Sequence, residues 1–376
     1  MSERDIRIDR WTTAADFGTG TADGVSLTAA GLIIERAVGT LSRTDRFLGS
    51  TTTYEYATWT SPTVEVGFAV AEMIPSFTAS TPGRSWISIE LRADDRWFDL
   101  GEWAADDTEI SRTSIGGQAA VRTDVLVTPL TSWQIRVRLL RPVGGTDAPV
   151  VHTIGAVATG PYDAATDTPS APGTAIGSAL AVPQFSQRVH AGRYPQWADG
   201  GGSWCSPTSV SMVAAFWKTG PTEADYAWVD PTYADPQVIH AARSTYDHAY
   251  AGCGNWVFNT AYAGRFGLDA FVTRLRSLRD AEAFIAAGIP LVVSAAYEIG
   301  DVPGVDYRTS GHLLVIVGFT DDGDPIVNDP AAIDNAAVRK VFGRAEFEAA
   351  WRRASGGVTY VIRPPDVALP TTLATR

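Results

Sequence analysis

Apolar and polar residues alternate with a period of two over much of the first 158 residues. The alternation is clearest at 64–70, 87–91 and 133–139, where every second residue is Val, Ile, Leu, Phe or Trp. A period of two with one polar face is typical of antiparallel strands in a sheet with one side in water. A cluster of Ser, Thr, Pro and Gly at 80–83 marks a turn between two of these runs. The pattern predicts an all-β sandwich of jelly-roll type over residues 1–158.

A stretch without periodicity follows at 159–181, and it is rich in Ala, Thr, Pro, Ser, Asp and Gly, as linkers are. From 182 to 376 helical and strand patterns mix. We expect helices at 210–217, 236–243, 256–263 and 277–288, and strands at 289–294, 311–319, 325–327 and 357–362. This order predicts an antiparallel sheet packed on helices, so the fold class of the chain is α+β.

Cys205 stands where one of the predicted helices begins. The segment 204–209 reads Trp-Cys-Ser-Pro-Thr-Ser and leads into the apolar run 210–217. Pro207 suits a first helical turn, because the amide that proline lacks would have no partner there. Free amides and the helix dipole at such an end favour an anion, which lowers the pKa of a thiol and makes it a nucleophile. The alternative is a small buried apolar residue, which is a common role for a free cysteine.

His312 is placed to serve as the base for this thiol. It begins the strand pattern 311–319, and the Asp-Gly turn that follows predicts a hairpin with 325–327. The hairpin returns Asn328 and Asp329 toward His312, where a carboxylate or an amide can hold one imidazole nitrogen. Only one of the two faces His312, because strand side chains alternate. Nucleophile, base and orienting group together form a cysteine-type triad.

Other side chains complete the candidate site. Gln187, upstream of Cys205, can donate its side-chain amide to the oxyanion that forms when a carbonyl is attacked, worth roughly 3 kcal/mol of barrier. Gln184 is the alternative donor.

Two further residues, Asn255 and Trp256, follow a glycine-flanked Cys253. We expect them on the rim of a substrate cleft, where they would bind the substrate backbone and a substrate side chain. The alternative is a loop without a role in binding.

Four motifs taken in order resemble a known family. They are Val-Pro-x-x-Ser-Gln at 182–187, Trp-Cys-x-Pro-Thr-Ser at 204–209, Gly-His-x-x-Val-x-x-Gly at 311–318 and Asn-Asp-Pro at 328–330. The set is similar to the bacteriocin-processing, double-glycine-leader cysteine peptidases and their stand-alone relatives in actinobacteria, a branch of the papain-like superfamily. The resemblance covers roughly 182–362 and implies a papain-like cysteine peptidase domain.

Carried over residue by residue, the resemblance implies Gln187 as oxyanion donor, Cys205 as nucleophile, His312 as base and Asp329 as orienting residue. Asn328 competes for the last role, since papain uses an amide there. The best-known members of the family are N-terminal domains of membrane transporters. This sequence has no transmembrane run and no phosphate-binding loop with lysine, so a double-glycine leader substrate is not implied.

Composition narrows the possible partners. With 42 acidic and 30 basic residues the formal charge is -12, which disfavours a nucleic acid and an anionic membrane surface. Arginine greatly outnumbers lysine, which reflects genome composition rather than function. The first ten residues alternate in charge and lack an apolar core, so no signal peptide is predicted and the chain is expected in the cytoplasm. A trimmed N-terminus would instead fit a secreted protein.

Metal and disulfide chemistry are also disfavoured. A bridge between Cys205 and Cys253 would consume the nucleophile, and two cysteines are too few for a disulfide scaffold. The acidic turn 320–324 lacks the full calcium-loop pattern, and no histidine pair has ligand spacing. We therefore expect no metal and no cofactor.

The combined pattern predicts a cysteine peptidase that hydrolyses a peptide or protein through a thioester, with the β-sandwich positioning the substrate. One alternative is an acyltransferase or amidase on the same thiol scaffold. Another is a non-catalytic module that binds peptide or glycan. For a glycan, Trp97 and Trp103 of the first domain offer rings that stack on sugars, although such aromatics more often belong to a core.

Overall fold

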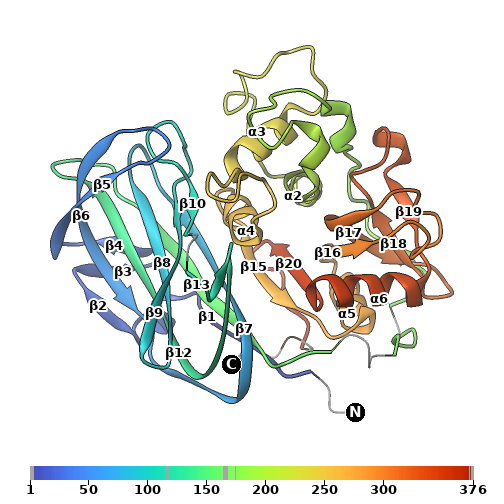
Figure 1. Cartoon of the computed structure of the whole chain (residues 1–376), viewed down its shortest axis with the longest axis horizontal. Coiled ribbons are helices and arrows are strands. Elements are labelled where there is room, and N and C mark those ends of the chain that lie inside the picture. The colour runs from blue at the N-terminus through green and yellow to red at the C-terminus, as the bar shows by residue number, and fades with distance from the viewer. Residues whose placement is uncertain (1–3, 116–117, 164–167, 174, 372, 374–376) are drawn as a thin grey trace. The chain divides into compact units, whose positions relative to one another are not determined.

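The computed structural model describes residues 4–115, 118–163, 168–173, 175–371 and 373, and it divides into two compact units (Figure 1). The β-rich unit comprises Asp5–Pro161 and Tyr246–Arg265. The α+β unit comprises Tyr162–Thr245 and Phe266–Ala374, together with the N-terminal end of the chain. The predicted α+β class is confirmed. Residues 246–265, which we expected in the second domain, belong to the β-rich unit.

The β-rich unit consists almost entirely of antiparallel strands, with one short and one longer helix. Its elements are β1 (Ile6–Trp11), α1 (Ala14–Phe17), β2 (Thr21–Asp23), β3 (Val25–Thr28), β4 (Gly31–Ile34), β5 (Gly39–Thr44), β6 (Thr51–Thr60), β7 (Val64–Ser80), β8 (Trp86–Ala93), β9 (Arg96–Trp103), β10 (Thr113–Ser114), β11 (Val121–Arg122), β12 (Val125–Pro142), β13 (Val150–Thr159) and α4 (Trp256–Gly264).

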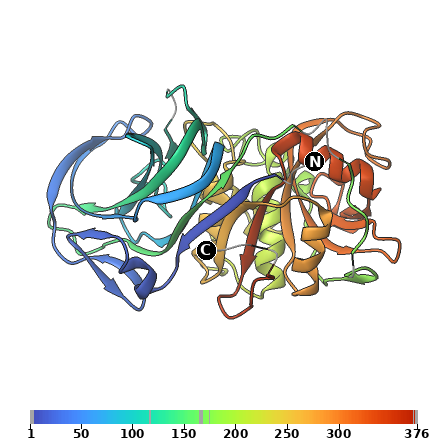
Figure 2. The ribbon, with the colours of Figure 1, turned by 90° about the horizontal axis from the view of Figure 1, so that it is seen from below.

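Two long strands join these elements into one continuous ladder. β12 pairs with β6, β7 and β8, and β7 continues to β13, so the sheet curls upon itself (Figure 2). Register shifts in the β7–β12 pairing mark where the strands bend. The period of two that the sequence shows at 133–139 is borne out, since Trp133, Ile135, Val137 and Leu139 are all buried. The intervening polar residues Gln134, Arg136 and Arg138 are half-buried and lie on the opposite face of the strand.

The core of this unit uses one of the two tryptophans considered for glycan binding. Trp103 is completely buried, with its ring centroid 6.0 Å from that of Phe77 and 5.3 Å from that of Phe258. The ring of Trp97 is covered by the guanidinium of Arg136, whose carbon lies 3.7 Å from the ring centroid. The proposed role of Trp103 in sugar stacking is therefore wrong, because a buried ring offers no face to a ligand.

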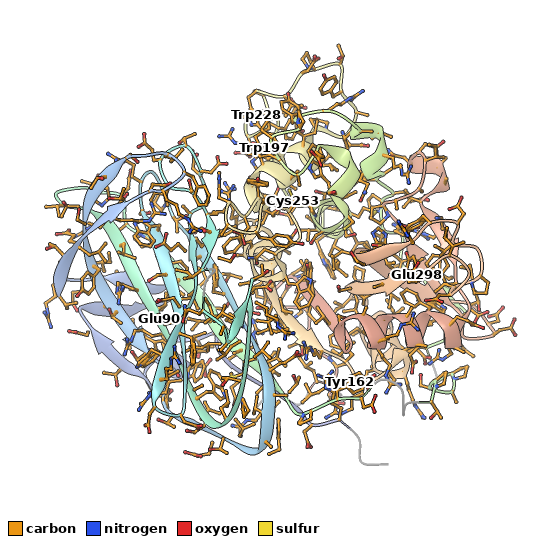
Figure 3. The ribbon with its side chains drawn as sticks, in the orientation of Figure 1. Glu90, Tyr162, Trp197, Trp228, Cys253 and Glu298 are labelled. Atoms are coloured by element: carbon orange, nitrogen blue, oxygen red, sulfur yellow. The ribbon has the colours of Figure 1, made fainter. Side chains whose placement is uncertain are left out.

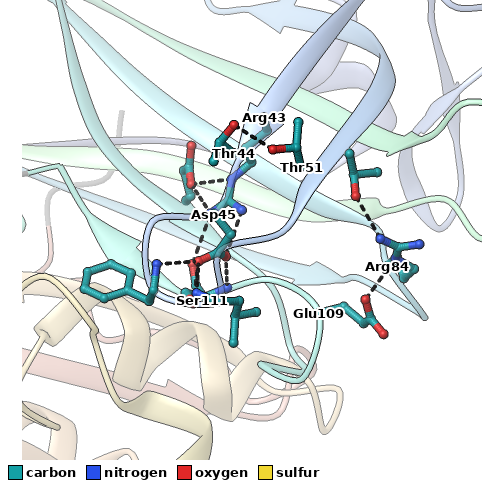
Figure 4. Close-up of polar contacts among 11 residues, drawn as sticks. Arg43, Thr44, Asp45, Thr51, Arg84, Glu109 and Ser111 are labelled. Atoms are coloured by element: carbon teal, nitrogen blue, oxygen red, sulfur yellow. Dashed lines mark hydrogen bonds and ion pairs between the residues drawn. The ribbon is translucent and has the colours of Figure 1, made fainter.

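A buried carboxylate fixes the turn after β5 (Figure 4). Asp45 accepts the backbone amide of Ser111 at 2.7 Å and its hydroxyl at 2.9 Å, and it pairs with Arg43 at 2.9 Å. It also accepts the amides of Phe47 and Leu48, each at 3.0 Å. Burial opposes the charged form, but these donors together lower the pKa of Asp45 well below its usual range. The carboxylate thus joins two distant loops of the unit.

Helix α4 is held by side chains far upstream in the sequence. The carboxylate of Asp124 accepts the amides of Trp256 at 2.6 Å and Val257 at 3.3 Å, where the helix begins. Burial and the nearby Asp247 charge raise the pKa of Asp124 to about 7, although the two amides oppose the shift. The ring of Phe258 rests on Trp103. Both the first two amides and the apolar face of α4 therefore depend on residues of the first 161.

Deleting residues 5–161 is expected to unfold α4, which belongs to the same unit. The deletion uncovers Phe258, whose full burial is worth about 1.5–3 kcal/mol. It also removes the carboxylate that satisfies the first amides of α4, at about 1.5–3 kcal/mol for a charged hydrogen bond. Hydrogen exchange of the amides at 256–264, measured in the truncated and the full chain, tests this expectation. Protection of these amides equal to that in the full chain would contradict it.

The α+β unit is built on a second antiparallel sheet, in the order β15-β20-β16-β17-β18-β19, with β14 paired to β17. The strands are β14 (Ser178–Ala179), β15 (Asp269–Arg274), β16 (Leu291–Tyr297), β17 (Thr309–Phe319), β18 (Pro325–Asn328), β19 (Arg339–Val341) and β20 (Val358–Arg363). The helices are α2 (Cys205–Phe216), α3 (Pro236–Thr245), α5 (Leu278–Ala286) and α6 (Arg344–Ser355), with short 3₁₀ turns η2 (Gln187–His190), η3 (Gly201–Ser203) and η4 (Asn335–Ala337). Within the described part of the chain, no helix has the length and apolar character needed to cross a membrane.

Candidate active site

Cys205 is the first residue of α2, as the sequence indicates. The helix is buried along nearly its whole length, and its hydroxyl side chains find internal partners. Ser206 bonds the Tyr360 hydroxyl at 3.0 Å, and Ser209 donates to the Leu313 carbonyl at 3.1 Å. These bonds fix the helix against β17 and β20, and Cys205 as a residue is half-buried. The first turn of α2, which carries the thiol, is thus anchored to the sheet.

His312 lies on β17 and links the thiol to a carboxylate. Its Nε2 is 2.8 Å from Oδ1 of Asp329, and its side chain shares a hydrogen bond with Cys205. Because Nε2 is taken by Asp329, the other ring nitrogen, Nδ1, serves the sulfur. The strand register places His312 opposite Ala295 of β16, and only 4% of its surface is exposed. The structure therefore brings the predicted nucleophile, base and orienting carboxylate together.

Asp329 follows the last residue of β18 and is completely buried. Its Oδ1 accepts from His312 and from the amide of Ala331 at 2.9 Å. Its Oδ2 accepts from the ammonium of Lys340 at 2.7 Å and from the Tyr307 hydroxyl at 3.0 Å. Four donors on two oxygens leave the carboxylate a single orientation.

Asn328 points away from the histidine. Its amide donates to the Pro183 carbonyl at 2.9 Å, and its oxygen accepts from Arg339 Nε at 2.5 Å. Since strand neighbours face opposite sides, the bond between Asp329 and His312 leaves Asn328 to hold the segment before Gln187. Of the two residues that the sequence left open, Asp329 is the one that touches the imidazole.

The electrostatics of the site favour a thiolate paired with an imidazolium. Burial opposes a charged sulfur, but the hydrogen bond and charge of His312, with the amides of Leu313 and Ser206, lower the pKa of Cys205 below its usual value. Burial likewise opposes the charged imidazole, but Asp329 and Cys205 raise the pKa of His312 to about 10. The pKa of Asp329 lies well below its usual range, because His312 and Lys340 outweigh burial.

Gln187 lies in η2, close in structure to the loop that precedes Cys205. Its side-chain amide donates to the Gly202 carbonyl at 2.9 Å, and its backbone amide donates to the Pro330 carbonyl at 2.9 Å. The side-chain oxygen is buried and has no partner among the described residues. Gln184 is occupied elsewhere, accepting the Arg339 amide at 3.0 Å. Gln187 is thus the glutamine placed beside the Cys205 loop.

Asn255 and Trp256 belong to the β-rich unit, whereas the other four candidate residues belong to the α+β unit. Asn255 is 1% exposed and caps α4, accepting the Phe258 amide at 2.9 Å while its amide donates to Asp247 at 2.9 Å. Both polar atoms of this side chain thus make contacts within the fold. For Asn255 and Trp256, a role in substrate binding stays a prediction.

Two features of the α+β unit escaped the sequence analysis. One is the set of Lys340, Tyr307 and Tyr297 around Asp329, in which the two tyrosine hydroxyls lie 2.6 Å apart. The other is a cluster of aromatic rings, in which Trp197 and Trp228 lie edge to face at 5.5 Å (Figure 3). No spacing in the sequence marks either set, since their members come from separate loops, from the end of β16 and from the three-residue β19.

The aromatic cluster stands next to the catalytic loop. Tyr194 stacks on Trp197 with ring centroids 5.4 Å apart, and the Trp197 carbonyl accepts the indole N–H of Trp204 at 2.6 Å. Trp204 directly precedes Cys205 and is completely buried. The cluster therefore stiffens the loop that delivers the thiol. As to metals, no group of three or more His, Cys, Asp or Glu side chains suited to an ion occurs among the residues described.

Comparisons with known families agree with this geometry. Residues 7–159 match the family described as "Peptidase C39 N-terminal domain", and residues 179–358 match the "Peptidase_C39 like family". The second match contains the four residues Gln187, Cys205, His312 and Asp329. A comparison with curated proteins gives no match.

Proposed function

The chain belongs to the C39-type family of cysteine peptidases, and on that premise we propose that it hydrolyses peptide bonds through a thioester on Cys205. The observation that carries the proposal is the chain of contacts at the N-terminus of α2. There the Cys205 thiol interacts with the His312 imidazole, and His312 is held at 2.8 Å by Asp329. Such an arrangement is what acyl transfer by a thiol requires.

Acylation begins with attack of the Cys205 thiolate on the carbonyl carbon of the scissile amide. The sulfur–carbon bond forms as the carbonyl becomes an oxyanion, which the Cys205 backbone amide and the Gln187 side-chain amide stabilise. His312, as the imidazolium, gives its proton to the amide nitrogen. The carbon–nitrogen bond then breaks, the amine leaves, and the acyl group remains on the sulfur.

Deacylation reverses the direction of proton transfer. His312, now neutral, takes a proton from a water molecule as its oxygen attacks the thioester carbonyl. The same donors stabilise the second oxyanion, which collapses with release of the carboxylic acid and of the Cys205 thiolate. Asp329 keeps the imidazole in one tautomer throughout, with Nε2 bearing a proton and Nδ1 exchanging it. No step needs a metal or a cofactor.

The substrate in this proposal is a peptide or protein, and the β-rich unit serves to position it. An acyltransferase or amidase would use the same acyl-enzyme and differ only in what resolves it. The discriminating experiment incubates the chain with a peptide mixture, with and without added amines, and identifies the products by mass spectrometry. New carboxyl termini in water support a peptidase, amine adducts in preference to acids support an acyltransferase, and the absence of any Cys205 thioester contradicts both.

The rate of hydrolysis is expected to be bell-shaped in pH. Because the pKa of Cys205 is lowered, the active ion pair forms on the acid side of the normal thiol range. Because the pKa of His312 is raised to about 10, activity is lost only as the pH approaches that value. The dependence of kcat/KM on pH tests this expectation. An optimum confined to a narrow range near the ordinary histidine pKa, ~6.5, would contradict it.

A further inference from the structure

Lys340 is one of only two lysines in a chain that contains 28 arginines; the other is Lys218. Its ammonium lies 2.7 Å from Oδ2 of Asp329, and its side chain is 24% exposed. Lysine offers a compact point charge, whereas the broad planar guanidinium of arginine suits bidentate contacts. In a chain that otherwise uses arginine for its positive charges, the ammonium next to the orienting carboxylate calls for a functional account.

The carboxylate of Asp329 is shared between two cations. Oδ1 faces His312 at 2.8 Å, and Oδ2 faces Lys340. Tyr307 donates a neutral hydrogen bond to the same Oδ2, and the hydroxyl of Tyr297 lies 2.6 Å from that of Tyr307. Oδ2 of Asp329 therefore accepts hydrogen bonds from two different donors, the charged ammonium of Lys340 and the neutral hydroxyl of Tyr307.

We propose that Lys340 is a positioning residue of the active site: its ammonium fixes the Asp329 carboxylate and shares its charge, so that the His312 imidazolium can release its proton to the leaving amine. The inference rests on the proposed function, because it concerns the proton transfer of acylation. In a buried site, an imidazolium that faces a carboxylate with no second cation on it holds its proton too firmly to act as a good acid near neutral pH. Lys340 reduces that hold while keeping Asp329 in place.

The groups that bear on His312 and Asp329 come from several elements. Cys205 reaches His312 from α2, Tyr297 comes from β16, Tyr307 from the 298–308 loop and Lys340 from β19. Both tyrosines have a raised pKa, through burial and then the charge of Asp329, so they stay neutral over the working range. Lys340 is therefore the second cationic side chain in contact with Asp329, beside His312.

The test replaces Lys340 by Met and follows the titration of His312 in the full chain. Carbon-13 histidine labelling reports the ring by NMR, with assignment by loss of its signal in His312→Ala. Removing one positive charge beside Asp329 stabilises the imidazolium, so K340M is expected to raise the pKa of His312 by about one unit. K340R, which keeps the charge, and K218M, which removes the other lysine, are expected to leave it near the native value.

A chemical version of the experiment avoids any dependence on folding of the variant. In folded K218M protein, Lys340 is the only lysine that remains. Acetylation neutralises it, whereas reductive dimethylation keeps its charge; hydroxylamine then restores any acylated Cys205. Acetylation should raise the pKa of His312 as K340M does, and dimethylation should not.

The two treatments also define the result that overturns the proposal. A His312 titration that is unchanged, or shifted downward, after both K340M substitution and acetylation would show that Lys340 is only a structural partner of Asp329. Since the readout is the histidine ring and not product formation, it does not depend on finding a substrate. Failure of the peptidase proposal would appear separately, as the absence of a Cys205 thioester.

Discussion

Replacing Cys205 by Ser lowers kcat/KM by on the order of 10⁵ in this account, because loss of a triad nucleophile commonly costs that much. A serine hydroxyl at the same helix end is isosteric but far less acidic than the thiol, so it does not form the ion pair with His312. The fold should be unaffected, since the two side chains have similar size and the anchoring bonds of α2 come from Ser206 and Ser209.

Cys253→Ser is the matched control. Cys253 belongs to the β-rich unit, outside the unit that holds His312 and Asp329, and is 1% exposed, so it takes no part in the proposed chemistry. Activity per folded molecule should stay within about twofold of native, even if the buried hydroxyl costs about 1–3 kcal/mol of stability. The account fails on this point if C253S removes activity from folded protein and C205S does not.

Asp329→Asn is expected to lower kcat by about 10³–10⁴, as loss of an orienting carboxylate does in other triads. The amide of Asn can turn its NH2 group, a donor, toward His312 Nε2, and this favours the imidazole tautomer with the proton on Nδ1. The substitution also removes the negative charge that faces the Lys340 ammonium. Asp322→Asn is the matched control, because Asp322 is an exposed residue of the hairpin turn. A D329N variant with native kcat would contradict the assigned role.

The same substitution changes the response of stability to acid. The pKa of Asp329 is lower in the folded chain than in an unfolded one, because His312 and Lys340 outweigh burial, so the folded state binds this proton less readily. The carboxylate therefore adds stability above its unfolded pKa, ~4, and that contribution is lost as the pH falls toward the folded value. Thermal melts should show a flatter acid dependence for D329N than for the native chain.

The candidate catalytic residues could be found in the sequence because each carries a local signal. Cys205 stands before an apolar helical run with Pro207 in its first turn, and His312 begins a strand that ends in an Asp-Gly hairpin turn. Such local patterns are informative because the conformation of the neighbouring backbone decides in which direction the side chain points. The choice of Asp329 over Asn328 needed three-dimensional contacts, since alternation says only that the two face opposite ways.

Other parts of the structure lack such signals. Helix α6 is polar, with a narrow buried stripe that includes Phe347 and Trp351, and β19 is three residues long, so Lys340 had no pattern to reveal it. Residues 246–265 read as part of the second domain because sequence order places them there. Their partner Asp124 lies more than a hundred residues away, and no periodicity reports a contact at that distance. The capping role of Asn255 was missed for the same reason, since it depends on that fold.

The most direct test of the account is the reactivity of the Cys205 thiol toward iodoacetamide at pH 6, in native protein and in His312→Ala. If the sulfur and the imidazole share a proton, the thiolate form of Cys205 is more populated at this pH in native protein than in the variant, and native Cys205 should react faster by on the order of 100-fold. Equal rates in the two proteins, both rising only through the ordinary thiol pKa of ~8.5, would contradict the central claim.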